Sequence, residues 1–285
     1  MKIKRWIGYF VLGVIVFGSL PVQACTLWAV NGSLVNGGGS MLVKNRDWLP
    51  NQYESLKAVF PKTGYSYFGL YTEGKYSGMK AGINKTGLVV ISATAGSIPA
   101  EARRAMPHTG GVLVKLLKEC SSVDEALART DLFLGPEILM LADKNKVATI
   151  EIGPEGHFAV TVKENSILYH TNHYVSEGML EFNRTIGESS QKRYDRIGQL
   201  LSSVTEPYDF STVISFSNDQ NDGPDNSIFR TGSMPTKPRT MAVWAVQIPP
   251  EGSPEVYIRI LNPNEAEKVV RITADDVFTG KLVLD

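Results

Sequence analysis

Cys25 is the residue of this chain best placed for covalent chemistry, because we expect it to become an N-terminal residue. Residues 1–24 have the pattern of a cleavable signal peptide: basic side chains precede a chargeless apolar run from Trp6 to Leu20, and the segment ends in the small residue Ala24. The pKa of a free thiol is about 8.5 and that of an α-amino group is about 8, so an N-terminal cysteine carries both a nucleophile and a proton acceptor. The pattern therefore predicts attack on a carbonyl carbon without a separate histidine base.

Cys120 is the one other cysteine of the chain and the one disulfide partner open to Cys25. It continues an apolar pattern with helical spacing over residues 112–117, which is typical of a core position. We therefore expect Cys25 to be a free thiol, although a bridge to Cys120 stays open. An unpaired cysteine in an exported chain indicates a reactive role.

A hairpin pattern predicts that a carboxylate and a cation return beside Cys25. Strand patterns flank the glycine-rich turn Asn36-Gly37-Gly38-Gly39, which is a strong hairpin signal. Pairing around a turn centred near Asn36 makes opposed residue numbers sum to about 72, which sets Cys25 across from Asp47, with a slip of one or two residues allowed. Lys44 lies on the same returning strand. The alternative is that Asp47 only caps a turn before Leu49-Pro50.

Six short motifs follow one another along the chain. They are Cys25-Thr26, Asn45-x-Asp47-Trp48, Gly82-x-Asn84-x-x-Gly87-Leu88, Thr171-Asn172-His173-Tyr174, Ser190-x-x-Arg193 and Ser227-Ile228-Phe229-Arg230. Together they resemble the N-terminal-nucleophile (Ntn) hydrolases that act on linear amides. The later motifs are similar to the penicillin N-acyltransferase and carcinine-hydrolase branch, which is related to choloylglycine hydrolases and penicillin V acylases. The resemblance runs in order over nearly the whole chain after residue 24.

The resemblance implies a four-layer αββα fold and assigns roles to particular residues. Cys25 would be the nucleophile and, through its amine, the base, while Asp47 would orient that amine. The carboxamide of Asn172 and the backbone N–H of Thr94 would donate to the tetrahedral oxyanion. Arg230 matches a family arginine near the thiolate.

Two positions depart from the patterns of the related enzymes. Bile-salt enzymes carry arginine three residues before the aspartate, where this chain has Lys44, which keeps the charge but loses the two-pronged contact of a guanidinium. Members of the acyltransferase branch often show Cys and His around the matched arginine, where this chain has Phe229 and Thr231. The substrate preference of that branch therefore does not transfer directly.

The elements expected to position these residues are mostly strands. Further strands are predicted near residues 56–60, 67–71, 79–83, 87–93, 138–142, 147–152, 157–162, 167–170, 241–247, 255–260 and 268–273, and helices near 111–120, 123–130 and 190–201. Strand runs interrupted by paired helices favour an α+β fold with helices outside two stacked antiparallel sheets. Because no repeat or linker divides the chain, residues 25–285 are expected to form a single catalytic domain.

Composition narrows the partners. Lys plus Arg equals Asp plus Glu at 29 each, so no long-range field favours nucleic acid. The apolar N-terminal run is too short for stable membrane insertion, and a periplasmic or secreted location is expected. No cofactor or metal is expected, since His170 and His173 have no further ligand at metal spacing and residues 219–223 match a calcium loop poorly. The expected partner is a small N-acyl amide, and a homo-oligomer stays open.

Two alternatives remain at this point. Val22-Gln23-Ala24-Cys25 also fits a lipoprotein signal, in which case lipid on the sulfur and nitrogen of Cys25 would abolish catalysis and leave a membrane-tethered binding module. An acyltransferase would keep the site but let an amine capture the acyl-enzyme in place of water. The acyl and amine parts of the substrate also stay open, with N-acyl amino acids, penicillin-type amides and bile-salt-type amides among the candidates.

Overall fold

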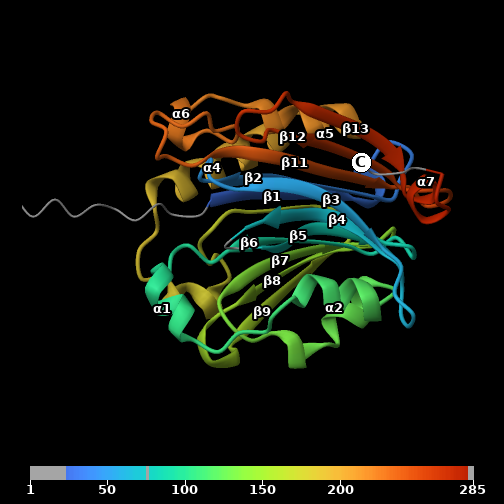
Figure 1. Ribbon diagram of the computed structural model, residues 1–285, viewed down its shortest axis with the longest axis horizontal. Helices are drawn as coiled ribbons and strands as arrows, with labels where there is room; N and C mark the ends of the chain where they lie inside the picture. Colours follow the sequence, from blue (N-terminus) through green and yellow to red (C-terminus); the bar gives the residue numbers. More distant parts are fainter. Residues whose placement is uncertain (1–23, 75–76, 282–285) are drawn as a thin grey trace, which may run out of the picture.

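The computed structural model describes residues 24–74 and 77–281 and shows two antiparallel sheets stacked face to face (Figure 1). The first sheet has the order β10 (Ile167–His170), β1 (Ala24–Asn31), β2 (Ser40–Trp48), β11 (Arg239–Ile248), β12 (Glu255–Ile260) and β13 (Lys268–Thr273). The second has the order β3 (Tyr53–Val59), β4 (Tyr67–Glu73), β5 (Gly78–Asn84), β6 (Val89–Thr94), β7 (Glu137–Ala142), β8 (Val147–Ile152) and β9 (Phe158–Lys163).

Helices form the two outer layers (Figure 1). The first sheet is covered by α4 (Glu188–Ser202), α5 (Phe210–Ser215) and α6 (Gly223–Asn226), and the second by α2 (Val112–Glu119) and α3 (Val123–Leu127). Two short helices, α1 (Ala100–Ala105) and α7 (Ala274–Phe278), lie at opposite ends of the molecule. Short 3-10 turns occupy Gly32–Leu34, Thr130–Leu132, Pro154–Gly156, Glu177–Phe182 and Phe216–Asn218. The arrangement is the expected α+β sandwich of four layers.

Strand β1 shows why the layers form. Each of its residues is buried, because alternate side chains enter different cores. Leu27 and Ala29 belong to the core between the sheets, whereas Trp28 and Val30 pack in the core beneath α4 and α5. A strand that is apolar on both faces is stable only between two other layers.

The hairpin of β1 and β2 forms as predicted, and its register is one residue from the central expectation, within the slip that was allowed. Cys25 is opposite Arg46, and Asp47 is opposite Ala24. The loop is closed by a hydrogen bond from the Gly32 N–H to the Gly39 carbonyl at 2.8 Å, so its centre falls before Asn36 rather than on it. A shift of one residue exchanges the two faces of a strand. The Cys25 side chain therefore shares the inter-sheet face with Arg46 and Lys44, while Asp47 faces the helical layer.

The predicted helices correspond to α2, α3 and α4, and every predicted strand is present. The helices α1, α5, α6 and α7 were not predicted, and each has six residues or fewer, which is too short for a readable helical period. The expected signal peptide lies outside the described residues except for Ala24. Among the helices of residues 24–74 and 77–281, none is long and apolar enough to cross a membrane.

Candidate active site

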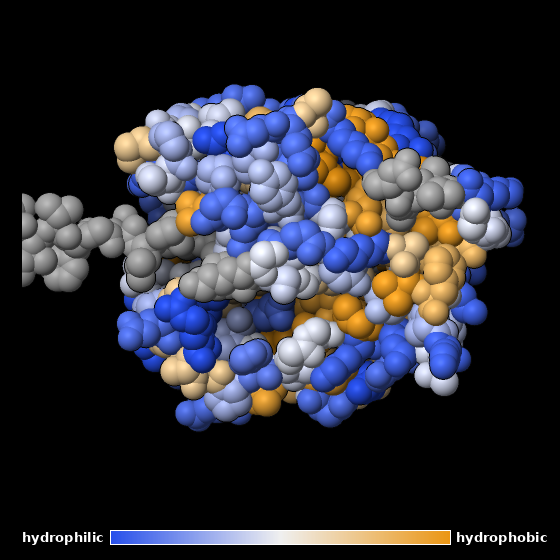
Figure 2. Space-filling model, viewed as in Figure 1, coloured by the Kyte–Doolittle hydropathy of each residue, from blue (hydrophilic) through white to orange (hydrophobic). Residues whose placement is uncertain are grey.

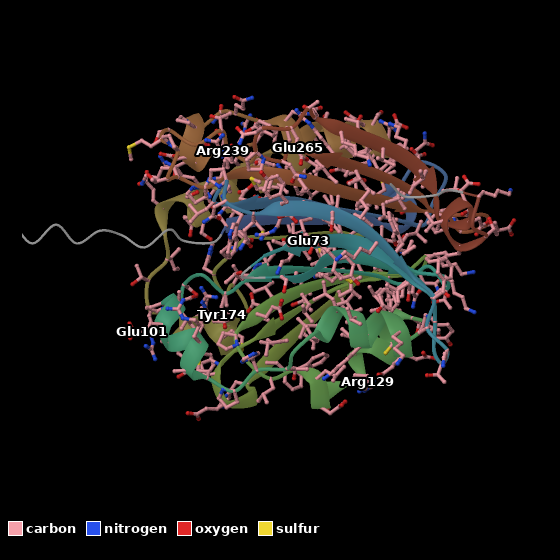
Figure 3. The ribbon with its side chains drawn as sticks, viewed as in Figure 1. Glu73, Glu101, Arg129, Tyr174, Arg239 and Glu265 are labelled. Atoms are coloured by element: carbon pink, nitrogen blue, oxygen red, sulfur yellow. The ribbon has the colours of Figure 1, made fainter. Side chains whose placement is uncertain are left out.

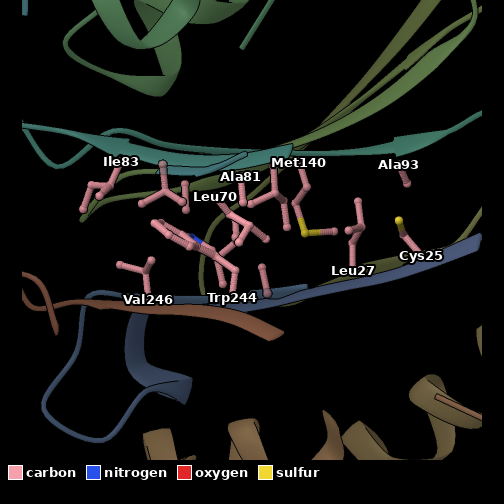
Figure 4. Packing of buried hydrophobic residues seen from close by; sticks show 14 of the residues in the cluster. Cys25, Leu27, Leu70, Ala81, Ile83, Ala93, Met140, Trp244 and Val246 are labelled. Atoms are coloured by element: carbon pink, nitrogen blue, oxygen red, sulfur yellow. The ribbon is translucent and has the colours of Figure 1, made fainter. Parts of the chain in front are cut away.

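Cys25 lies near the start of β1 with its side chain between the two sheets. Figure 4 shows the sulfur pointing from β1 toward the second sheet, beside Leu27 and facing Ala93. The residue is 4% exposed and is a free thiol, as is Cys120, so the alternative of a disulfide between them is absent. Cys25 lines a pocket of about 330 Å³ together with Lys44 and Thr94. The predicted nucleophile is therefore held in the core and opens on a cavity.

The main chain of Cys25 is fixed from the helical side of the sheet. Its backbone N–H donates to Asn172 Oδ1 at 2.8 Å, and its carbonyl accepts from Arg193 Nη1 at 2.6 Å. The same Nη1 donates to Thr26 Oγ1 at 2.9 Å. These contacts hold the beginning of β1 in one position relative to the pocket.

The carboxamide of Asn172 has one orientation that satisfies its neighbours. Its oxygen accepts from the Cys25 N–H and from Arg193 Nη2 at 3.1 Å, and both of these groups are obligate donors. Its Nδ2 donates to the Thr94 carbonyl at 2.9 Å. An amide nitrogen carries two hydrogens, and the Thr94 carbonyl takes one of them. The structure thus brings together three of the predicted residues, Cys25, Asn172 and Thr94.

The loop that carries Asn172 is itself fastened to helix α4. The Ser190 hydroxyl accepts from the Asn172 backbone N–H at 3.0 Å and contacts His173 Nδ1 at 2.9 Å. Burial, with smaller contributions from His170 and Arg193, lowers the pKa of His173 to about 4, so the ring is neutral at neutral pH.

A buried pair supports the same loop from the second sheet. His170 Nε2 lies 2.6 Å from Glu151 Oε1 on β8, and the Glu151 carboxylate accepts from the backbone N–H groups of Val175 and Ser176. Burial opposes ionisation of Glu151, but the His170 contact and these backbone hydrogen bonds outweigh it and hold its pKa below the usual range. Within the described residues, no group of three or more His, Cys, Asp and Glu side chains is arranged to hold a metal ion.

Lys44 supplies a fixed cation beside the thiol. Its ammonium donates to the Lys80 carbonyl at 2.7 Å and to the Ser92 carbonyl, and its side chain is 1% exposed. Burial lowers the pKa of Lys44 to about 8, and the nearby Cys25 sulfur opposes this shift. Two separate carbonyl acceptors suit the tetrahedral donors of an ammonium.

Asp47 and Arg230 lie together on the other side of the sheet. The Asp47 carboxylate accepts from Thr240 Oγ1 at 2.9 Å, and Arg230 Nη1 is 3.8 Å from Oδ2. Burial raises the pKa of Asp47, while Arg230, Arg193 and the Thr240 hydrogen bond lower it. Among the described residues, Asp47 Oδ2 and Arg230 Nε and Nη1 are buried without a hydrogen-bond partner. The structure places this pair behind the start of β1, while the side-chain acceptor for the Cys25 N–H is Asn172.

Arg193 is the residue of this cluster to which the sequence assigned no role. It is 1% exposed and contacts Cys25, Thr26 and Asn172. Burial lowers its pKa to about 10, still well above neutrality, so the guanidinium stays charged. The available signal was the spacing Ser190-x-x-Arg193, which puts both side chains on one face of a helix. A charged residue on the buried face of an amphipathic helix indicates a site when a polar partner accompanies it.

A larger hollow of about 530 Å³ includes Gly87, Lys144 and Pro249. It contains none of the candidate catalytic residues. His108 and His157 are exposed and lie outside the cluster around Cys25.

Comparisons with known proteins agree with this geometry. The sequence model described as "Acyl-coenzyme A:6-aminopenicillanic acid acyl-transferase" matches residues 34–260, a range that includes Asp47, Asn172 and Arg230 and begins after Cys25. A mutant of conjugated bile acid hydrolase from Clostridium perfringens has a similar structure, with TM-score 0.55, 12% identity and coverage of 88% of this chain and 93% of that chain. Penicillin V acylase from Agrobacterium tumefaciens has TM-score 0.54, 15% identity and coverage of 88% and 86% respectively. The comparison with curated proteins gave no match.

Proposed function

Because the chain belongs to the acyl-coenzyme A:6-aminopenicillanic acid acyl-transferase family, we propose that it is an exported N-terminal-cysteine amidase. In this proposal, removal of residues 1–24 exposes Cys25, whose sulfur cleaves the amide bond of a non-peptide N-acyl compound through a thioester. The family and the two structural neighbours support an Ntn-type enzyme that acts on acyl amides.

One observation carries the proposal: Cys25 presents both its sulfur and its nitrogen to the same site. The sulfur lines the pocket, and the nitrogen donates to Asn172 Oδ1 at 2.8 Å. Cleavage before Cys25 would turn this nitrogen into an amine that is already hydrogen-bonded. A nucleophile and a base would then belong to one residue, at a distance set by its own covalent geometry.

The charges behind β1 suit an amine at this position. Asp47 is opposite Ala24 in the hairpin, and its Oδ2 is buried without a hydrogen-bond partner among the described residues. Removal of Ala24 would create the Cys25 amine next to this position, so Asp47 Oδ2 can accept a hydrogen bond from it. Arg193 and Arg230 both act on the Asp47 carboxylate. Two guanidinium groups against one carboxylate leave a net positive charge, which favours the neutral, proton-accepting form of the amine.

In the first chemical step, the Cys25 amine takes the thiol proton and the sulfur attacks the carbonyl carbon of the substrate. The second hydrogen of Asn172 Nδ2 and the backbone N–H of Thr94 are the proposed donors to the oxyanion. Collapse of the tetrahedral intermediate breaks the carbon–nitrogen bond, and the amine returns the proton to the departing nitrogen. Water then attacks the thioester and gives a proton to the amine. The carbon–sulfur bond breaks, the amine returns this proton to the sulfur, and the carboxylic acid leaves.

The burial of Cys25 bears on the lipoprotein alternative. A lipid-modified cysteine needs its sulfur and nitrogen at the surface, joined to acyl chains that insert in a membrane. Cys25 is 4% exposed and lies in a hydrogen-bonded strand, so a diacylglyceryl group would have to be accommodated inside the protein. This geometry supports processing that leaves Cys25 unmodified, and with it a periplasmic or secreted location.

Trapping the acyl-enzyme tests the proposal. Exported wild-type protein would be mixed with N-acyl amino acids, penicillin-type amides and bile-salt-type amides, quenched in acid and analysed by mass spectrometry. We expect the acyl group on Cys25, removable by hydroxylamine, and its loss in Cys25→Ser. Cys120→Ala is the matched control, because it removes the other thiol. Equal release of acid by Cys25→Ser, or acylation elsewhere, would refute the proposed nucleophile.

Acyl transfer is the second candidate, because the family description itself names an acyl-transferase. The same thioester would be captured by an amine in place of water. Adding increasing concentrations of an amine during turnover measures the partition between acid and new amide. A product ratio that favours the amide at low millimolar amine would identify a transferase, and acid as the sole product would identify a hydrolase.

A further inference from the structure

The pocket beside Cys25 is strongly cationic in a chain that is neutral overall. Of the described residues that line it, five carry positive charge, Lys44, Arg46, Lys80, Arg103 and Arg104, and one, Glu137, is acidic. The whole chain has 29 basic and 29 acidic residues, so this concentration is local. A recess lined by one sign of charge raises the local concentration of ligands of the opposite sign.

Three of the five cations have local partners. Arg46 pairs with the buried Glu54 at 3.4 Å and stacks on Trp48 at 4.4 Å. The Lys44 ammonium is bound to two backbone carbonyls beside the sulfur. Lys80 is the charge that acts most strongly on Glu137. These groups organise the reaction end of the pocket.

Arg103 and Arg104 remain, side by side on helix α1. Arg103 Nε donates to the Ile98 carbonyl at 3.0 Å, which anchors that side chain. Within residues 24–74 and 77–281, the terminal guanidinium nitrogens of Arg103 and Arg104 have no hydrogen-bond or ion-pair partner. The acidic residue of α1, Glu101, is exposed and lies on the outer side of the helix (Figure 3). The surface over α1 is strongly hydrophilic in Figure 2.

A second hollow continues the pocket along α1. It has a volume of about 260 Å³ and shares Thr94, Arg103, Arg104 and Glu137 with the first. Trp48 and Met79, in contrast, line only the first pocket. The combined groove thus has Trp48 and Met79 beside the partnered cations at the Cys25 end, while the two arginines of α1 line both hollows.

We propose that Arg103 and Arg104 determine specificity for a dicarboxylate head group, so that the substrate is the N-acyl amide of a dicarboxylic amino acid. The acyl chain lies toward Trp48 and Met79, and the two carboxylates lie along α1. This assignment rests on the proposed amidase function of Cys25. The two guanidinium groups balance two negative charges, and the terminal nitrogens of each can bind a carboxylate through two hydrogen bonds.

The placement of the two arginines favours two separate carboxylates over one compact phosphate. Consecutive helical residues diverge by about 100° around the axis, so their side chains leave the helix in different directions. A single phosphate group would require the two guanidinium groups to converge. The two carboxylates of an N-acyl glutamate are attached to Cα and Cγ, so each can meet one guanidinium group.

A matched set of amides tests the inference. N-octanoyl-L-glutamate carries two carboxylates, N-octanoyl-L-glutamine carries one, and N-octanoyl-O-phosphoethanolamine carries one phosphate. The same three head groups would be prepared with a phenylacetyl chain. We expect kcat/KM for the glutamate amide to exceed that for the glutamine amide by about 10- to 100-fold, the range for a charged hydrogen bond. Arg103→Gln and Arg104→Gln should each lower kcat/KM for the glutamate amide about tenfold. The variant that lacks the partner of the side-chain carboxylate should lower the glutamate-to-glutamine ratio by the same factor. Added salt should lower the ratio.

Controls separate this inference from the proposed function. Lys144→Gln removes an exposed cation from the 530 Å³ hollow and should leave the ratio unchanged. Binding of the same amides to Cys25→Ala, measured by calorimetry, reports head-group preference without turnover. Charge-selective binding without cleavage by the wild type would refute the amidase function alone. Cleavage with equal kcat/KM for the glutamate and glutamine amides, or a preference for the phosphate, would refute the dicarboxylate subsite alone.

Discussion

Replacing Arg193 by lysine tests whether the guanidinium fork holds the reaction centre together. One ammonium on a shorter stem keeps the positive charge near Asp47 but cannot reach Cys25 O, Thr26 Oγ1 and Asn172 Oδ1 at once, as the native Nη1 and Nη2 do. The Cys25 carbonyl is then the acceptor expected to lose its hydrogen-bond donor, because Asn172 Oδ1 still accepts from the Cys25 N–H. A buried acceptor without a partner costs about 1–3 kcal/mol.

The catalytic effect should be larger than the effect on stability. Arg193 Nη2 holds Asn172 Oδ1, which orients the Nδ2 group of the same carboxamide toward Thr94. Loss of one oxyanion donor costs about 10²–10³ in kcat, so a loosened donor should cost about 10- to 100-fold. We therefore expect Arg193→Lys to lower kcat by this factor and to reduce the free energy of unfolding by about 1–3 kcal/mol.

Urea unfolding and steady-state hydrolysis of one cleaved amide give both quantities. Arg196→Lys is the matched control, since Arg196 lies on the same helix and forms a partly buried ion pair with Asp219 at 2.7 Å, away from Cys25. It should change stability by less than about 1 kcal/mol and leave kcat unchanged. Native kcat in Arg193→Lys, with the iodoacetamide reactivity of Cys25 also unchanged, would contradict the positioning role.

The remaining predictions concern the nucleophile, its carboxylate and two buried ionisable groups. Cys25→Ser should lower amide hydrolysis at least about 10²-fold with the urea midpoint retained, because a hydroxyl is the weaker nucleophile here; native turnover would contradict this. Asp47→Asn should leave Cys25 open to alkylation but slow turnover about tenfold or more, and unchanged kinetics would remove Asp47 from the mechanism. Burial lowers the pKa of Lys44 to about 8 from its usual 10.5, so the native state releases this proton first. The wild type should therefore gain up to about 3 kcal/mol of stability relative to Lys44→Met as pH rises from about 8 to 10.5, and parallel curves of urea unfolding against pH would argue against a buried ammonium. The pKa of Glu151 is held below 4.5, so its carboxylate stabilises the fold above that pH and loses this effect as pH falls through the lower value. Below about pH 4.5, the free energy of unfolding of Glu151→Gln should fall less than that of the wild type, as measured by acid unfolding.

The strands were predictable because buried strands and the glycine-rich turn leave strong local patterns. The register was not, since a shift of one residue depends on how the loop Gly32–Gly39 closes rather than on its composition. The shift of one residue decides which face a side chain occupies, and it puts Asp47 on the face of the sheet opposite the Cys25 sulfur. Nothing in the residue types of Asn36 and Gly39 predicts that the Gly39 carbonyl accepts the closing hydrogen bond from Gly32.

Site residues that belong to a motif could be predicted from the sequence, whereas residues brought to the site by tertiary packing could not. Cys25, Asn172 and Thr94, which the motifs assigned to one site, are linked by hydrogen bonds from the Cys25 N–H to Asn172 and from Asn172 to the Thr94 carbonyl. Arg193 was quoted within a motif, but its contacts with Cys25 and Asn172 arise from the packing of α4 on β1 and β10. The cationic pair on α1 belongs to a helix of six residues with no readable period, so its position over the pocket comes from the fold.

The central claim is that the working enzyme begins at Cys25 with sulfur and nitrogen both unmodified. Mass spectrometry of the N-terminal peptide, from protein exported by its own host and quenched during turnover, tests it directly. The account predicts a peptide that starts at Cys25, with a free α-amine and an acyl group from the substrate on sulfur that hydroxylamine removes. A chain that starts at any other residue, or a Cys25 that carries diacylglycerol or an acylated amine, would contradict the account.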